Sequence, residues 1–208
     1  MKRVIGIDFD NTIICYDSLL HKIALERGLI DKTAKKNKKY IRDIIRRMTE
    51  GEILWQRLQT SIYGEWIKEA KIADGVREFL LLSNRKEAKV FVISHKTEFP
   101  ATDPAGVNFH KAAFKWMEGK GFFDNHGIGL SRDNVFFEPT RQKKCECIKH
   151  LGCMYFIDDL IEVFLDDAFP STTSKILYDP HGEYSSVPDI VTASSWASIG
   201  DIIFDARS

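Results

Sequence analysis

Short apolar segments that alternate with helix-like segments constrain the fold of this chain most strongly. Residues 3–7 (RVIGI) and 88–93 (AKVFVI) are β-branched or apolar runs typical of buried strands. Because parallel strands need long crossover connections, this alternation predicts an α/β fold with a mostly parallel sheet and helices on both faces. Further strands are expected at 134–137, 154–157 and 175–178, and helices at 76–82, 108–120, 141–151, 161–167 and 196–204.

The segment 16–72 interrupts the alternation. Apolar residues such as Leu19, Ile23, Ile41 and Ile45 recur there at helical spacing, and no strand-like run appears before about residue 71. Such a segment is too long for one crossover in a compact sheet. The sequence therefore predicts an α/β core of residues 1–15 and 73–208, and a small helical cap inserted as residues 16–72.

Polar residues follow three of the expected strands. Asp8 and Asp10 come after the first strand, Ser94 after the second, and Asp158 with Asp159 after a later one. In open α/β sheets, ligands bind in the crevice at the carboxyl ends of the strands. We therefore expect these residues, distant in sequence, to meet at one site.

The residue types at this site suit phosphoryl transfer. Asp8 and Asp10 flank the apolar Phe9, so an extended backbone turns both carboxylates to one side. One carboxylate can attack phosphorus and form an aspartyl-phosphate, while the other moves protons. The Ser94 hydroxyl can bind the phosphoryl oxygens, and a lysine can neutralise charge. The sequence thus predicts Asp8 as the nucleophile and Asp10 as the general acid and base.

A magnesium ion fits the same residues. Mg²⁺ binds to one or two carboxylates together with waters and substrate oxygens, which favours Asp8 and Asp158 as ligands. Asp159 or Glu162 is expected to support them from the second layer.

These motifs resemble those of the haloacid dehalogenase-like hydrolase superfamily, in order and over essentially the whole chain. The first motif, an apolar strand followed by D-x-D-x-T, matches Asp8, Asp10 and Thr12; the second, VFVIS, ends at Ser94; the fourth, YFIDDLIE, holds Asp158, Asp159 and Glu162. The resemblance implies a Rossmann-like fold of the capped phosphatase type. It also implies a lysine ahead of the fourth motif, for which Lys144 is favoured over Lys143, and Mg²⁺ held by Asp8, Asp158 and the backbone carbonyl of Asp10, with Asp159 beside them.

The resemblance leaves the activity open between several classes. A phosphatase acting on a small phosphate monoester fits best, and a phosphomutase would use the same residues. True dehalogenases of similar fold lack the second acid, so Asp10 points away from them. A phospho-accepting receiver domain carries its acids in another order and lacks a helical insertion, but a non-catalytic binding protein of related fold stays open.

The charge pattern and the hydropathy pattern limit the partners. The net charge is zero, yet residues 31–47 hold eight Lys or Arg against two Asp. That run has Tyr40 as its one aromatic residue, so we expect no nucleic-acid partner and consider instead a solvated helix face or attraction of an anionic substrate. Arg46 and Arg47 could face a second anionic group.

No apolar run approaches membrane-spanning length, which favours a cytoplasmic protein without a membrane partner.

Overall fold

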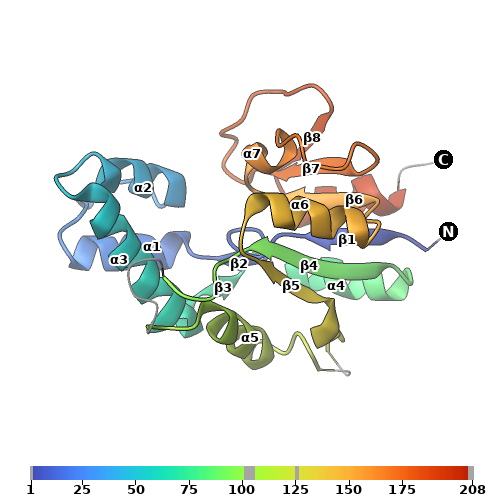
Figure 1. Cartoon of the computed structure of the whole chain (residues 1–208), viewed down its shortest axis with the longest axis horizontal. Helices are drawn as coiled ribbons and strands as arrows, with labels where there is room; N and C mark the ends of the chain where they lie inside the picture. Colours follow the sequence, from blue (N-terminus) through green and yellow to red (C-terminus); the bar gives the residue numbers. More distant parts are fainter. Residues whose placement is uncertain (1, 101–105, 125–126, 206–208) are drawn as a thin grey trace.

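The sheet of the computed structural model is parallel throughout (Figure 1). The structure describes residues 2–100, 106–124 and 127–205, and within them six strands follow the order β5-β4-β1-β6-β7-β8. Every neighbouring pair is parallel, which confirms the predicted α/β sheet. The strands are β1 Val4–Ile7, β4 Lys89–His95, β5 Val135–Glu138, β6 Tyr155–Asp158, β7 Ser174–Tyr178 and β8 Ile190–Ala193.

Helices cover both faces of the sheet, as the crossover argument predicts. Along β4, Val90 and Val92 belong to one apolar cluster, whereas Phe91 and Ile93 belong to the other. Alternate side chains point to opposite faces, so each face needs its own cover. The first cluster includes residues of α4 Val76–Arg85, α5 Phe109–Gly119 and α8 Trp196–Gly200, and the second includes residues of α6 Arg141–His150 and α7 Ile161–Phe164. Short helical turns lie at η2 Arg132–Asn134 and η3 Asp201–Asp205.

A helical lobe, residues 16–70, follows the first strand. It contains α1 Asp17–Glu26, α2 Lys38–Arg46, α3 Gly51–Gly64 and η1 Ile67–Glu69 and lies beside the sheet in Figure 1. A two-stranded antiparallel ribbon, β2 Ile14–Cys15 with β3 Lys71–Ile72, joins its two ends. The buried side chains of the lobe, Trp55 and Leu58 among them, continue into the apolar cluster under one sheet face. The division into two domains at these positions stays a prediction.

Strand β1 sits between β4 and β6, and its Gly6 explains how closely it packs. A Cβ atom at Gly6 would lie 2.6 Å from the Phe156 ring of β6 and 3.0 Å from the Cys153 sulfur. Glycine is therefore needed for this approach. Because β1 and its two neighbours carry Asp8, Ser94 and Asp158 near their carboxyl ends, the strand order itself gathers these side chains.

Several element boundaries differ from the expectation. Strand β4 runs to His95, so Ser94 lies inside a strand and not just after one. The short strands β2, β3 and β8 were not predicted, because two-residue pairings and an edge strand with two exposed central residues have no clear apolar pattern. Across the described residues, no helix is both long and apolar enough to cross a membrane.

Candidate active site

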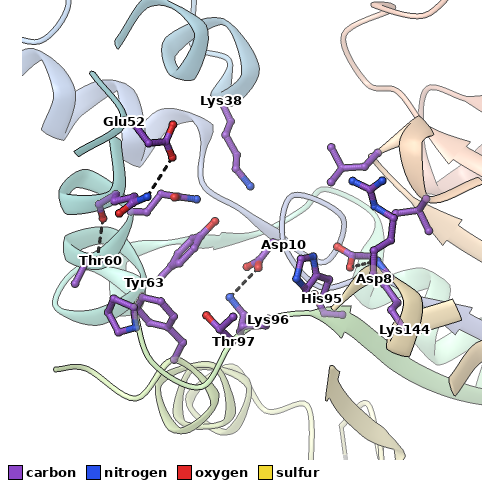
Figure 2. A pocket seen from close by; sticks show the side chains of 18 residues that line it. Asp8, Asp10, Lys38, Glu52, Thr60, Tyr63, His95, Lys96, Thr97 and Lys144 are labelled. Atoms are coloured by element: carbon purple, nitrogen blue, oxygen red, sulfur yellow. Dashed lines mark hydrogen bonds and ion pairs between the residues drawn. The ribbon is translucent and has the colours of Figure 1, made fainter. Parts of the chain in front are cut away.

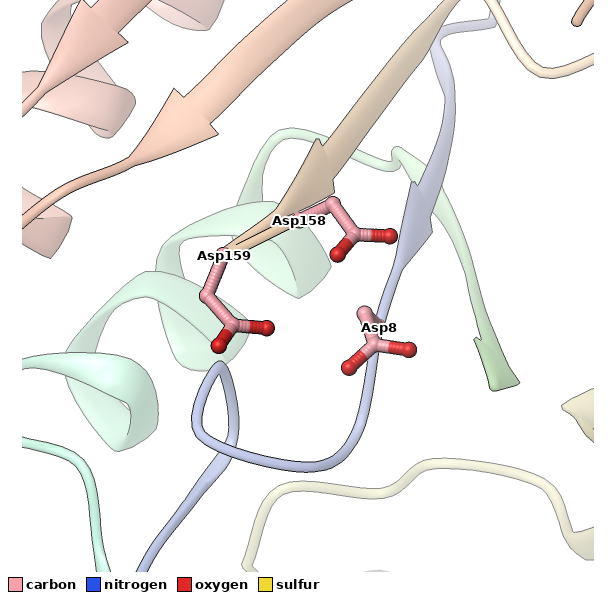
Figure 3. A group of neighbouring side chains, drawn as sticks. All are labelled: Asp8, Asp158 and Asp159. Carbon is pink, nitrogen blue, oxygen red and sulfur yellow. The ribbon is translucent and has the colours of Figure 1, made fainter. Parts of the chain in front are cut away.

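Three carboxylates meet where β1 and β6 end (Figure 3). Oxygens of Asp8, Asp158 and Asp159 all lie within 4.8 Å of one another. Asp8 and Asp158 are buried, and Asp159 is half-buried. The Asp8 N–H donates to the Ile157 carbonyl at 2.9 Å, which continues the β1–β6 pairing and fixes Asp8 beside Asp158. The parallel strands thus force three like charges into one small region.

Lys144 is the cation that offsets part of this charge. Its Nζ donates to Asp8 Oδ1 and to Asp158 Oδ2, both at 2.6 Å, and its side chain is almost fully buried. Burial disfavours the ammonium, but Asp158 and Asp8 outweigh this and raise the pKa of Lys144. Its neighbour Lys143 is exposed and pairs with Glu146 instead. The structure places Lys144, and not Lys143, in the site.

Asp158, the last residue of β6, and Asp159, which follows it, retain protons more readily than ordinary aspartates. Burial and the Asp8 charge raise the pKa of Asp158 to about 7, against the opposing effect of Lys144. Burial and Asp158 raise the pKa of Asp159 well above its usual range. One ammonium therefore does not balance three carboxylates. The Thr12 hydroxyl donates to Asp159 Oδ1 at 3.4 Å, which links the β1 loop to this pair.

Asp10 belongs to a second, separate ion pair. Lys96 Nζ lies 2.7 Å from Asp10 Oδ2, and the Lys96 side chain is 3% exposed. Burial opposes ionisation of Asp10, but the Lys96 charge outweighs it and holds the pKa of Asp10 below its usual value. The carboxylate of Asp10 is not one of the three clustered above. The structure thus places Asp8 and Asp10 in different ion pairs, although only Phe9 lies between them.

Aromatic rings enclose the Lys96 ammonium. It lies 4.2 Å from the centroid of the Tyr63 ring, 5.8 Å from that of Phe9 and 5.9 Å from that of Phe109. Ring faces attract a cation, so these contacts favour a charged Lys96. Tyr63 belongs to α3, so this ring contact links the helical lobe to Lys96, the partner of Asp10.

Tyr16, at the start of α1, also faces Asp10. Its side chain is buried, and burial together with the Asp10 charge raises the pKa of Tyr16 well above its usual value. A neutral hydroxyl can donate a hydrogen bond to a carboxylate. Asp10 is thus paired with Lys96, which follows β4, and lies near Tyr16 of the helical lobe.

Several of these groups line a cavity of about 380 Å³ between the sheet and the helical lobe (Figure 2). From the sheet side it is lined by Asp8, Asp10, Ser94 and Lys144, so all four predicted catalytic residues reach it. From the lobe it is lined by Lys38, Gln56, Thr60 and Tyr63, and by others. Pockets of about 300 to 1,000 Å³ suit small molecules.

The comparisons with known proteins identify the fold. No protein-family model matches the sequence, and no curated protein does. Among solved structures, the chain is similar to a haloacid dehalogenase-like family hydrolase from Streptococcus pneumoniae, with TM-score 0.60, 11% identity, and 97% and 98% of the two chains covered. It is also similar to the HAD-hydrolase YfnB from Bacillus subtilis bound to magnesium, with TM-score 0.56, 11% identity, and 98% and 99% covered. A HAD-superfamily hydrolase from Ehrlichia chaffeensis gives TM-score 0.53 and 15% identity over 99% and 98%.

This chain has the haloacid dehalogenase-like fold. At these identities the likeness concerns the fold, which confirms the structural part of the resemblance drawn from the motifs. It spans nearly the whole length of each chain, so the helical lobe falls within the matched region. The activity has to be argued from the site.

The residues that a haloacid dehalogenase-like fold brings together here fit a divalent cation. Asp8, Asp158 and Asp159 provide the hard oxygen ligands that Mg²⁺ prefers, and one lysine stands beside the three carboxyl groups. A bound Mg²⁺ would supply the positive charge that the cluster lacks and would polarise phosphoryl oxygens. The chemistry of this donor set therefore fits a divalent cation, and the Asp10 carboxylate lies outside the set; the assignment of metal ligands stays a prediction.

Some residues behave differently from the sequence expectation. Glu162 is exposed and stands outside the carboxylate cluster, so Asp159 is the acid beside the site. Arg46 pairs with Glu52 at 2.7 Å, and Arg47 is exposed and does not line the cavity. The sequence reasoning also missed Tyr16, Lys38 and Tyr63, because nothing in the helical block indicated which face looks toward the strands.

Proposed function

We propose that this protein is a magnesium-dependent phosphohydrolase that acts on a small phosphate monoester through an aspartyl-phosphate on Asp8. One observation carries the proposal: Asp8 shares Lys144 with Asp158, while Asp10, held apart by Lys96, lines the same cavity. A nucleophile, a metal-type carboxylate set and a separate acid–base group are the parts that such a reaction needs.

In the first step, a carboxylate oxygen of Asp8 forms a bond to phosphorus while the bond from phosphorus to the ester oxygen breaks. The leaving oxygen takes a proton from Asp10. In the second step, Asp10 takes a proton from water, the water oxygen attacks phosphorus, and the bond to Asp8 breaks to release phosphate. Each proton transfer contributes roughly 10²- to 10⁴-fold to the rate.

The ion pair between Asp10 and Lys96 affects when the Asp10 carboxyl gains its proton during the reaction. Since Lys96 favours the ionised carboxylate, Asp10 is ready for the base step and has to gain a proton on substrate binding before the acid step. Lys144 and the Ser94 hydroxyl bind and orient the phosphoryl oxygens. Asp8, Asp158 and Asp159 would hold a metal ion, which would supply positive charge to the phosphoryl oxygens.

A dehalogenase is the rival within this fold, and one similar solved structure is described as a dehalogenase, with TM-score 0.54 and 14% identity over 97% and 96% of the two chains. Asp10, fixed by Lys96 and facing Tyr16, supports the phosphatase because carbon–halogen cleavage leaves a halide that needs no proton. Halide release from haloacids is therefore a necessary control.

The test is to incubate the protein with Mg²⁺ and a panel of phosphate monoesters and to follow free phosphate. Wild-type protein should release phosphate from at least one ester, and Asp8→Asn should not. Equal release by both proteins would contradict the nucleophile, and release of chloride from chloroacids without phosphate release would favour the dehalogenase. A cytoplasmic location and a small phosphorylated partner belong to the same proposal.

A further inference from the structure

Lys38 is anchored at the edge of the catalytic cavity by contacts between the helical lobe and the core. It begins α2, and its backbone N–H donates to Asp17 Oδ1 at 2.9 Å. The preceding Asn37 caps α2 by accepting from the Tyr40 N–H at 2.8 Å. Asn37 Nδ2 donates to Glu183 Oε1 at 2.9 Å, on the loop between β7 and β8. The backbone of Lys38 is thus fixed relative to both walls of the cavity.

The side chain of Lys38 reaches into this cavity (Figure 2). Burial lowers the pKa of Lys38, but the nearby Tyr63 and Asp10 outweigh burial and raise it. The ammonium is therefore charged. Yet no salt bridge among the described residues includes Lys38, since Asp10 pairs with Lys96 and Asp159 belongs to the carboxylate cluster.

A second chamber of about 440 Å³ adjoins the first, between α2 and the loop that follows β7. Residues that line both chambers mark the junction. Two of them are cations, Lys38 and Arg141, and Arg141 also takes part in no salt bridge within the described part of the chain. The junction is lined by Lys38, Gln59, His95, Arg141 and Leu160.

The other cations around the two chambers already have partners. Arg42 pairs with Asp43 at 3.0 Å, and Arg46 with Glu52 at 2.7 Å. Lys39 lies over the Tyr184 ring, 4.9 Å from its centroid. Lys38 and Arg141 are therefore the cations at the junction whose charge is left for a ligand.

We propose that Lys38 and Arg141 bind a second anionic group, a carboxylate or a second phosphate, on the part of the substrate that leaves. This inference rests on the proposed function and names its substrate class: phosphate esters with an anion beyond the reacting phosphoryl group. Charge-assisted hydrogen bonds to such a group select it over a neutral hydroxyl of similar size. In this role Lys38 determines specificity and takes no part in bond breaking.

The test compares matched esters on Lys38→Gln, with Lys36→Gln as the control. Lys36 is exposed, carries the same charge and lines neither chamber. One pair of esters is glycerol 3-phosphate and 3-phosphoglycerate, and the other is fructose 6-phosphate and fructose 1,6-bisphosphate. The first pair tests a carboxylate as the second anion, and the second pair tests a phosphate.

We expect wild-type protein to prefer the doubly anionic member of at least one pair. Lys38→Gln should lower kcat/KM for that member about 10- to 100-fold, mainly through KM. It should change kcat/KM for the partner ester by less than about 3-fold. Lys36→Gln should alter neither, and Lys38→Arg should restore part of the preference. Arg141→Gln is a second, independent variant should Lys38→Gln fail to fold.

Equal loss on both members of a pair would overturn the inference, because Lys38 would then hold the reacting phosphoryl group. Absence of any wild-type preference would overturn it too. Calorimetry on Asp8→Asn separates failure of this inference from failure of the proposed function. It measures the binding of 3-phosphoglycerate and of glycerol 3-phosphate without hydrolysis. If no ester is hydrolysed, the proposed function fails, while tighter binding of 3-phosphoglycerate that Lys38→Gln removes still supports the subsite. Equal binding of both members overturns it when fructose 6-phosphate and fructose 1,6-bisphosphate also bind equally.

Discussion

The sheet and the helical lobe form opposite walls of one cavity, but they are built differently. On the sheet side, Asp8, Asp158 and Lys144 are buried, and the Lys144 ammonium donates to both carboxylates at 2.6 Å. On the lobe side, Gln56 and Tyr63 are half-buried and come from a helix surface. The strand ends fix groups whose positions reaction chemistry requires, whereas the lobe wall can change its side chains at little structural cost. We therefore expect substitutions on the sheet wall to affect rate and stability, and those on the lobe wall to affect substrate choice.

The largest effect should come from Asp8→Asn. Removal of the nucleophile should lower kcat for phosphate release by roughly 10⁴-fold or more, because no neighbouring group replaces it. The measurement is phosphate release under single-turnover conditions, with Asp167→Asn as the control for loss of one exposed acid. A residual rate within about 10-fold of wild type would show that the sheet wall does not supply the nucleophile.

The next largest effect should come from Lys144→Met. The variant leaves Asp8 and Asp158 without their shared cation, so kcat should fall about 10²- to 10³-fold. Without added metal, the free energy of unfolding should also fall by about 3 to 5 kcal/mol, because a buried charge loses its partner. Lys143→Met is the matched control, since that lysine is exposed and pairs with Glu146. Similar losses in both variants would remove the distinction between the two lysines.

Magnesium should stabilise the folded protein through the sheet wall alone. At about 100 times its dissociation constant, a ligand specific for the folded state adds about 2.7 kcal/mol to the free energy of unfolding. For a chain of this size that corresponds to a rise in Tm of roughly 5 to 10 °C. Thermal unfolding with and without MgCl₂ measures it, and Asp158→Asn should lose most of the rise. A rise that persists in Asp158→Asn would place the ion elsewhere.

The smallest effect should come from Tyr63, where the lobe meets the Asp10–Lys96 pair. Tyr63→Leu removes the ring over Lys96 and should lower kcat about 3- to 10-fold, in line with a cation–π contact of about 1 kcal/mol. Tyr63→Phe keeps the ring and loses only the hydroxyl, which lies near Lys38, so it should affect kcat less and KM more. If both variants lower kcat equally, the ring does not support Lys96.

The site residues differ in how far the sequence could predict them. Asp8, Ser94 and Asp158 could be placed near one another because each lies close to the carboxyl end of a strand, and parallel strands end at one edge. The order of the strands, which puts β1 between β4 and β6, is not encoded in any local pattern. Lys144 was favoured over Lys143 by its distance from Asp158 alone. A one-residue shift along α6 turns a side chain by about 100° around the helix, so burial decided between them.

The helical lobe shows the limit more clearly. The basic run at 31–47 was apparent, but Lys38, Lys39, Arg42 and Arg46 end in four different surroundings. Local spacing predicts that a helix forms and which face is apolar. It does not predict what lies opposite the polar face, because that depends on the ribbon of β2 and β3 and on contacts with the distant loop after β7.

The sequence by itself determined the parallel α/β fold, the helical insertion and the set of acids at the strand ends, since hydrophobic periodicity and strand geometry act over a few residues. Tertiary structure alone decided that Asp8 shares a lysine with Asp158 while Asp10 pairs with Lys96 inside an aromatic enclosure. Charge pairing depends on distances of a few ångströms between residues far apart in the chain, and those distances are fixed only when the sheet and the lobe pack together.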